Sequence, residues 1–274
     1  MSSLTVRKLE IDLSDGFGRH WLGGDAYRTQ LFNALSMTFP VGEQMFIDSV
    51  RAVPPEQLAD PGLRADVKDF IGQEASHRFV HIQYNAQLAR QGLDFTLGPS
   101  ILRRVEHIYK LPLHARLAIT CALEHYTAIL ADGALLHPEW LGDAEPAMRT
   151  LWSWHAVEET EHKAVAFDAY LAAGGKYWPR VLWYLQVSSI FWTDTFRQTV
   201  HNLRNDGQLY KAGTWISAAR TWFGRRGMAW HILPQALRYL SPSFHPWQHD
   251  NRRLVSMWLD GNSSAFRAVN STPS

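Results

Sequence analysis

The chain has 274 residues, of which 46% are hydrophobic and 19% are charged, so it can bury a large core in one domain or in one domain with an appendage. Its 27 basic residues nearly balance 26 acidic ones, and no basic tract occurs, so nucleic acid is not expected as a partner. The single cysteine, Cys121, excludes an internal disulfide and a zinc site built from cysteines. The N-terminal stretch is charged throughout and has no apolar segment like that of a secretory signal, so we expect a cytoplasmic protein.

Apolar residues recur mostly at spacings of three and four, which predicts an all-α fold. After an N-terminal arm (1–25), turns rich in proline and glycine divide residues 26–175 into four long helices, which predicts a ferritin-like four-helix bundle. Pro112 interrupts the third of these helices. The four helical stretches are expected near 26–53, 61–91, 99–136 and 146–173.

Residues 176–262 differ from the bundle in composition, because eight of the 12 tryptophans follow residue 175. We expect additional C-terminal helices here, packed on the bundle, and a flexible tail at 263–274. The apolar stretch 181–193 is shorter than the roughly 20 residues that cross a bilayer. Its helix is expected to be buried, an interfacial or dimer helix is the alternative, and a spanning helix ranks last. Because tryptophan favours interfaces, peripheral membrane contact is a further hypothesis.

One short stretch, WHAVEETEHKAVAFDAY, carries an unusual density of acids and imidazoles. His155, Glu159 and His162 stand at i, i+4 and i+7, which share one face of a helix. Glu159 and His162 also form a Glu-x-x-His pair, and Glu74 and His77 form a second such pair on an earlier helix. Two matches to so short a motif are only suggestive by themselves.

The order of these acids and histidines along the chain is more specific than either motif. Glu43, in FPVGEQMF, precedes the first pair, and Glu124, in ITCALEHYTAIL, lies between the two pairs. Glu, Glu-x-x-His, Glu, Glu-x-x-His on four helices is the ligand order of ferritin-like di-iron and di-manganese bundles. Four carboxylates in one apolar core would repel one another, and two divalent cations would supply the compensating charge.

Carboxylate and imidazole ligands without thiolate favour two iron ions, with manganese–iron, di-manganese and di-zinc sites as alternatives. We expect the two motif glutamates to bridge the metals and the two motif histidines to bind one metal each. The remaining glutamates, Glu43 and Glu124, are expected to be terminal ligands.

Several segments of the chain resemble those of a known family. GEQMFIDSVR, QEASHRFVH, LEHYTAILA, WHAVEETEHKAVAFD and FHPWQHDN look like segments of the bacterial predicted metal-dependent hydrolases, over most of residues 30–260. His155, one turn before Glu159, resembles the His-x-x-x-Glu-x-x-His of the p-aminobenzoate N-oxygenases, where the extra histidine completes a three-histidine, four-carboxylate site. This second resemblance is confined to ligand spacing, and it implies His155 as a seventh ligand.

Several polar residues near the motifs are assigned other roles. Glu158 and Glu161 are expected to face solvent. For His81, one turn beyond the first motif, packing is favoured over a contact with a ligand. His245 and His249 are assigned to a structural corner or to a cavity lid.

A reduced di-iron site of this kind reacts with O2, so the first interpretation is an O2-activating oxidoreductase. It would hydroxylate, desaturate or N-oxygenate a small-molecule or lipid-like substrate, and it would need an electron donor. Glu43 and Glu124 would be the catalytic glutamates, moving aside as O2 or substrate approaches. The alternative is the two-metal hydrolase of the family name, with a glutamate as general base. A non-catalytic metal-binding protein is the third class, and a homodimer is compatible with each.

Overall fold

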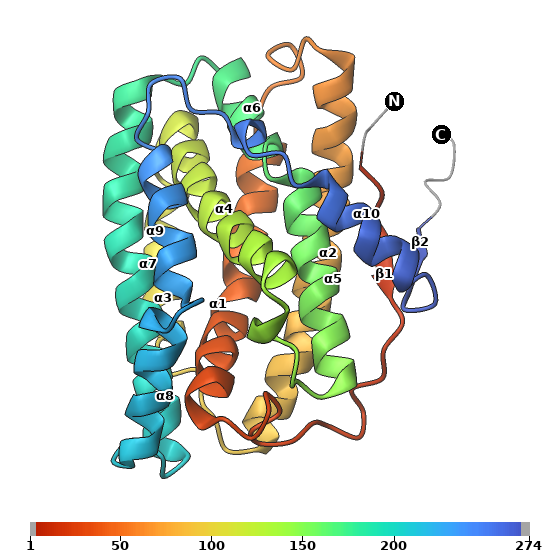
Figure 1. The fold of residues 1–274 in the computed structure, drawn as a ribbon. Helices are drawn as coiled ribbons and strands as arrows, with labels where there is room; N and C mark the ends of the chain where they lie inside the picture. The colour runs from red at the N-terminus through yellow and green to blue at the C-terminus, as the bar shows by residue number, and fades with distance from the viewer. Residues whose placement is uncertain (1–3, 270–274) are drawn as a thin grey trace.

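The computed structural model describes residues 4–269 and confirms the predicted all-α bundle (Figure 1). Its central helices are α1 (Ala26–Arg51), α2 (Pro61–Arg90), α4 (Leu113–Leu136) and α5 (Pro146–His162). Helix α1 packs along α2, and α4 packs along α5. A shorter helix, α3 (Gly98–Ile108), precedes α4, and Pro112 lies between them as predicted.

Local chemistry explains where the first two long helices begin. Asp25 accepts a hydrogen bond from the backbone N–H of Arg28, which caps α1. Asp60 caps α2 in the same way, through the N–H groups of Gly62 and Leu63. Helix α2 ends before Gly92, whose φ of 78° lies in the left-handed region that glycine adopts without steric cost. The predicted bounds of these helices are therefore close to the observed ones.

The fourth predicted helix, 146–173, is interrupted at Lys163 and Ala164, after which α6 (Val165–Ala172) begins. Lys163 is buried at this break. Its ammonium donates to the backbone oxygen of His249 and to Oδ1 of Asn251, each at 2.6 Å. The break therefore places a buried lysine where oxygen atoms of the C-terminal loop accept its hydrogen bonds.

The C-terminal helices cover one side of the bundle, as Figure 1 shows. They are α7 (Tyr177–Asn205), α8 (Ala212–Phe223) and α9 (Met228–Arg238), and α10 (Arg252–Gly261) lies on α5 instead. Helix α7 packs against α1 and α4. The expectation that α7 is a buried helix is wrong for one face, because Tyr184 and Val187 are buried while Leu182 and Leu185 are exposed. Among the described residues, no helix combines the length and apolarity that crossing a membrane requires.

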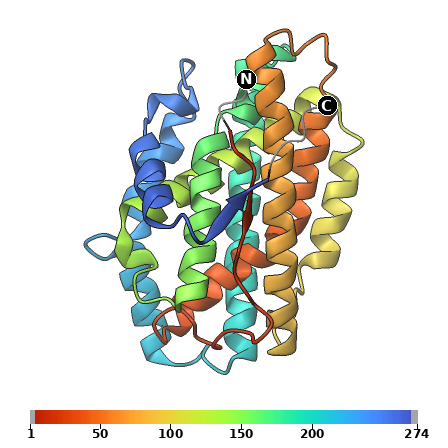
Figure 2. The ribbon, with the colours of Figure 1, turned by 90° about the vertical axis from the view of Figure 1, so that its right-hand side faces the viewer.

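Both ends of the described chain contain a short strand. Strand β1 (Arg7–Leu9) pairs antiparallel with β2 (Phe266–Ala268), and the two lie across α2 and α5 (Figure 2). The N-terminal arm is therefore more regular than predicted. The predicted flexible tail is wrong for 266–268, and 270–274 lie outside the described residues.

Apolar side chains fill the bundle in two neighbouring clusters. Phe70 belongs to one and Trp154 to the other, and both are fully buried. The ring of His162 contacts Phe70, and the ring of His77 contacts Trp154. The polar centre described below therefore lies between two apolar clusters.

Leu117 and Leu136 offer a matched test of this core, because both lie on α4 and only Leu117 is fully buried. Leu117→Ala should lower the free energy of unfolding by about 2–5 kcal/mol, since it leaves a cavity in the core. Leu136→Ala should change it by less than about 0.5 kcal/mol. Denaturant unfolding followed by circular dichroism measures both, and similar losses would contradict the assigned core.

Candidate metal centre

All seven predicted ligands converge inside the bundle. Helix α1 supplies one glutamate, α2 and α5 supply the two Glu-x-x-His pairs, α4 supplies one glutamate, and α5 adds the extra histidine. Each of these side chains is buried, with no more than 4% of its residue surface exposed. They are Glu43, Glu74, His77, Glu124, His155, Glu159 and His162.

The ligand atoms lie close enough to share metal ions. In four groups, one nitrogen or carboxylate oxygen from each residue lies within 4.8 Å of the others. The groups are Glu43–His81–His155, Glu43–Glu74–His77, His77–His155–Glu159 and Glu74–Glu159–His162. The carboxylates of Glu43, Glu74 and Glu159 each belong to two groups, which is the placement that bridging carboxylates would need. Glu124 adjoins the last group, with its Oε2 3.5 Å from Nε2 of His162.

Many of these atoms have no hydrogen-bond partner among the described residues. This holds for both carboxylate oxygens of Glu43, Glu74 and Glu124. It holds as well for Nδ1 of His77 and Nε2 of His162. Buried polar atoms are rarely left unpaired, because each loses its hydrogen bonds to water. The unpaired atoms are those that would face a metal ion, so the donor set fits a metal centre.

His77 is oriented by Glu158. Nε2 of His77 donates to Oε2 of Glu158 at 3.1 Å, which leaves Nδ1 facing Glu74 and Glu159 at 3.7 and 3.5 Å. A carboxylate on the far nitrogen of a ligand histidine fixes its tautomer and raises its basicity. Glu158 therefore holds His77 with Nδ1 directed at Glu74 and Glu159, where it could bind a metal.

His162 is oriented from the opposite helix in a matching way. Its Nδ1 donates to Oε1 of Gln73 at 3.0 Å, and its Nε2 lies 3.2 Å from Glu74. Gln73 and Glu158 each directly precede a motif glutamate, and each binds the histidine of the other helix. The two motif helices thus hold one another's histidines.

The prediction that Glu158 and Glu161 face solvent is wrong for both, because Glu158 is fully buried and only 15% of the Glu161 side chain is exposed. The reason is β1, which covers this face of α5. The backbone N–H of Arg7 donates to Glu158 at 3.2 Å, and its guanidinium binds both oxygens of Glu161 at 2.6 and 2.9 Å. Short strand pairing between the chain ends was not visible in the sequence pattern, so the role of Arg7 was missed.

His155 is oriented by a chain of hydrogen bonds that includes His81. The Ser36 hydroxyl donates to Asn85 at 2.9 Å, so it accepts from Nδ1 of His81 at 2.8 Å. Nε2 of His81 must then accept from Nδ1 of His155, at 2.9 Å. Nε2 of His155, 3.1 Å from Glu159, therefore keeps its lone pair for a metal. The expectation that His81 is merely packed is wrong.

Charges within the centre shift its pKa values in opposite directions. Burial, reinforced by the charge of Glu74, raises the pKa of Glu43 and that of Glu124 well above the ordinary value. Burial alone would lower the pKa of His77, but the hydrogen bond to Glu158 and the nearby carboxylates of Glu159 and Glu74 raise it well above the ordinary value. His162 behaves likewise, because the charge of Glu159 outweighs the effect of burial on its pKa. Without metal, protons therefore offset part of the repulsion.

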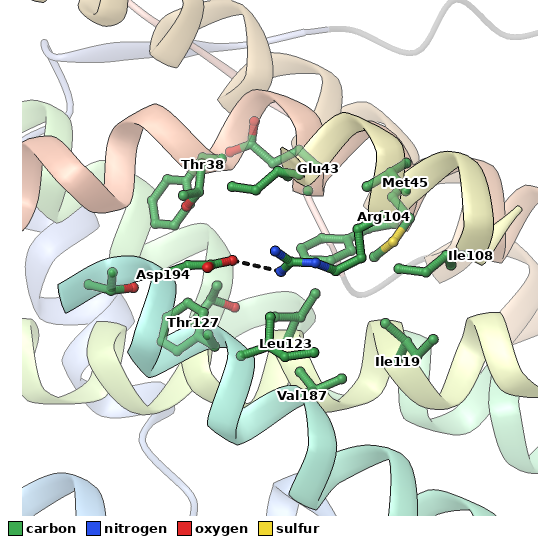
Figure 3. Close-up of a pocket in the computed structure, with 18 of the residues that line it drawn as sticks. Thr38, Glu43, Met45, Arg104, Ile108, Ile119, Leu123, Thr127, Val187 and Asp194 are labelled. Carbon is green, nitrogen blue, oxygen red and sulfur yellow. Dashed lines mark hydrogen bonds and ion pairs between the residues drawn. The ribbon is translucent and has the colours of Figure 1, made fainter. Parts of the chain in front are cut away.

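A pocket opens beside this centre, with about 250 Å³ of space. Glu43, His155 and Glu159 line one end, and mainly apolar side chains of α1, α3, α4 and α7 line the rest. Figure 3 shows Glu43 at this pocket together with Arg104 and Asp194, whose ion pair at 2.6 Å joins α3 to α7. The metal centre is thus accessible to a largely apolar ligand.

The other singled-out histidines lie outside the centre. His245 pairs with Asp168 at 2.9 Å, and His249 lies 3.1 Å from Asp132. The same loop receives the ammonium of Lys163. Of the two roles considered for His245 and His249, these contacts support the structural corner.

Metal affinity should distinguish a residue that binds the metal from a residue that only orients a ligand. Glu74→Gln should abolish tight metal binding, because it removes the carboxylate of a residue that belongs to two of the groups. Glu158→Gln should weaken metal affinity by about tenfold to a hundredfold, since it loosens His77. Titration with competing chelators measures both. The exposed Glu106→Gln on α3 is the control, and equal affinity in all three variants would rule out the proposed ligand geometry.

The metal-free protein should lose stability as pH rises from about 6.5 to about 8. Above the ordinary histidine pKa of 6.5, the folded chain keeps protons on His77 and His162 that the unfolded chain has lost, so the free energy of unfolding falls. The raised pKa values of Glu43 and Glu124 act in the same direction. Below pH 6.5 the effect is opposed by the lowered pKa values of His81, His155 and His125. Thermal unfolding of chelator-treated protein measures this. The Glu43→Gln/Glu124→Gln double variant should show a flatter profile, and a wild-type profile that rises between about pH 6.5 and about pH 8 would contradict it.

Comparison with known proteins places the chain in a family. No curated protein and no solved structure matches it. The family model described as predicted metal-dependent hydrolase matches residues 5–250, which include every candidate ligand. The chain therefore belongs to the family of predicted metal-dependent hydrolases.

Proposed function

We propose that this protein is a two-metal enzyme that acts on a substrate whose apolar part occupies the pocket beside the centre. One observation carries the proposal: buried ligand atoms of the centre lack hydrogen-bond partners, and three of the ligand residues also line the pocket. Seven ligands arranged in overlapping groups suit two ions better than one. Metal chemistry and substrate binding would then occur at one place.

Hydrolysis is the first candidate reaction, because the family description names it. This description favours the hydrolase alternative over the O2-dependent interpretation made from the sequence. A bound metal pair would supply a water of lowered pKa and would polarise the substrate.

Within this chain, Glu43 is suited to proton transfer. It lines the pocket, and neither of its oxygens has a hydrogen-bond partner among the described residues, so its carboxylate could exchange a proton with a bound substrate.

The pocket walls define what the substrate must look like. Apolar side chains such as Met45, Leu123 and Phe191 exclude water from the space next to Glu43. The Arg104–Asp194 pair spans the pocket between α3 and α7, so it offers a charged contact for one polar end of a substrate. We infer a substrate with an apolar body and one polar group.

Oxidation with O2 is the second candidate, and the donor set favours it. Four carboxylates and three imidazoles, without thiolate, lie in a bundle of long helices, which is the ligand type of di-iron proteins. This reaction would require iron, O2 and an electron donor. It keeps the same pocket and the same ligands.

The experiment compares the two reactions on one preparation. Protein reconstituted with zinc, manganese or iron is given esters and amides of increasing chain length without O2, and chemically reduced iron protein is given the same compounds with O2. Hydrolysis without O2, lost in Glu74→Gln, supports the first candidate. O2 consumption without hydrolysis supports the second, and neither activity leaves a non-catalytic metal-binding protein.

A pocket variant adds a test of substrate placement. Leu123→Trp should raise KM about tenfold for long-chain substrates with metal content unchanged, because the larger ring fills the pocket. Leu136→Trp, at an exposed position of the same helix, is the control. Equal effects of the two variants would contradict the assigned pocket.

A further inference from the structure

Large apolar side chains are concentrated on the outer surface of the C-terminal helices. Of the 19 such exposed side chains within residues 4–269, eleven lie between residues 178 and 237. On the surface of a water-soluble protein, large exposed apolar patches indicate contact with a partner or a membrane. The eleven are Trp178, Leu182, Leu185, Phe196, Tyr210, Trp215, Ile216, Phe223, Trp230, Leu233 and Leu237.

These residues follow helical spacing along α7 and α9. Trp178, Leu182 and Leu185 stand at i, i+4 and i+7 of α7, so they share one face. On α9, Trp230, Leu233 and Leu237 repeat the pattern at i, i+3 and i+7. Helices α7, α8 and α9 lie together on one side of the bundle (Figure 1), and we call their exposed faces the α7–α9 surface.

The charge of the same segment is strongly asymmetric. Residues 176–249 contain nine Lys or Arg and two Asp or Glu, whereas the rest of the chain contains 18 and 24. Both acids are already paired: Asp194 binds Arg104, and Asp206 binds Arg19 and His20. The near-zero net charge of the whole chain therefore hides a basic C-terminal side.

We propose that the α7–α9 surface binds the anionic face of a phospholipid bilayer. Tryptophans and leucines would enter the headgroup boundary, and arginines such as Arg220 and Arg225, exposed beside them, would face lipid phosphates. A second copy of the chain is a poorer occupant, because a two-fold contact would bring two surfaces of like charge together. Helix α7 would lie along the membrane.

The bilayer would also bring substrate to the pocket, an extension that rests on the proposed function. Trp183, Gln186 and Ile190 of α7 line the pocket, and they alternate along the helix with the exposed Leu182 and Leu185. An apolar compound dissolved in the membrane would thus meet the pocket beside the bound surface. The substrate class that follows is a lipid-like molecule.

Vesicle flotation with full-length protein tests the binding step without any activity assay. The protein should float with vesicles of phosphatidylcholine and phosphatidylglycerol, more weakly with phosphatidylcholine alone, and less as salt is added. Phe223→Ser and Arg225→Glu should each lower the partition coefficient by about fivefold, because each removes one contact with the interface.

Matched controls lie on α2, away from this surface. Phe79 is 59% exposed against 66% for Phe223, so Phe79→Ser removes a comparable aromatic ring. Lys68→Glu reverses an exposed charge as Arg225→Glu does. Absence of flotation, or equal losses in test and control variants, overturns the proposal. So does a concentration-dependent dimer that Phe223→Ser abolishes while flotation is unchanged. If flotation behaves as expected and the enzyme assays fail, only the proposed function is lost.

Discussion

Four buried carboxylates lie close together in the bundle, and their mutual repulsion must be balanced before the helices can pack. The chain supplies part of the balance itself, because the surrounding carboxylates raise the pKa of His77 and that of His162. Burial raises the pKa of Glu43 and of Glu124, so these carboxyls favour their neutral forms. Metal cations would replace such protons with larger and fixed charges, and they would bind the ligand atoms that have no hydrogen-bond partner among the described residues.

The centre divides into anchored and unanchored ligands. The histidines are held from behind by Glu158, Gln73 and His81, so their ligand nitrogens have defined directions. Within residues 4–269, Glu43 and Glu124 have no hydrogen-bond partner that fixes their carboxylates, and Glu43 also lines the pocket. Histidines in fixed positions could retain bound metals while the carboxylates move and a substrate or water exchanges on the pocket side. This division suits either of the two reactions considered.

Helical periodicity and ligand order predicted most of the bundle, and the seven candidate ligands that they indicated lie together in the structure. Each ligand lies on a long helix, where spacing alone decides which side chains share a face, as for His155 and His162. What surrounds the ligands was less predictable. Glu158 stands one residue from Glu159, and only the strand that contains Arg7 decides that its side is covered. The exposed face of α7 was predicted only as the alternative to a buried helix, because its apolar residues occur on all sides of the helix, which is also the pattern of a buried one.

The pairing of β1 with β2 makes the two ends of the described chain parts of one ribbon beside the metal centre. Arg7 belongs to that ribbon and contacts Glu158, a residue 151 positions away that orients His77. A shortened version lacking the first ten residues would keep every ligand and every bundle helix. It would nevertheless expose one side of α5 to water and let the Glu158 side chain rotate. Deleting residues that are distant in sequence would therefore change the orientation of His77 and, with it, the affinity for metal.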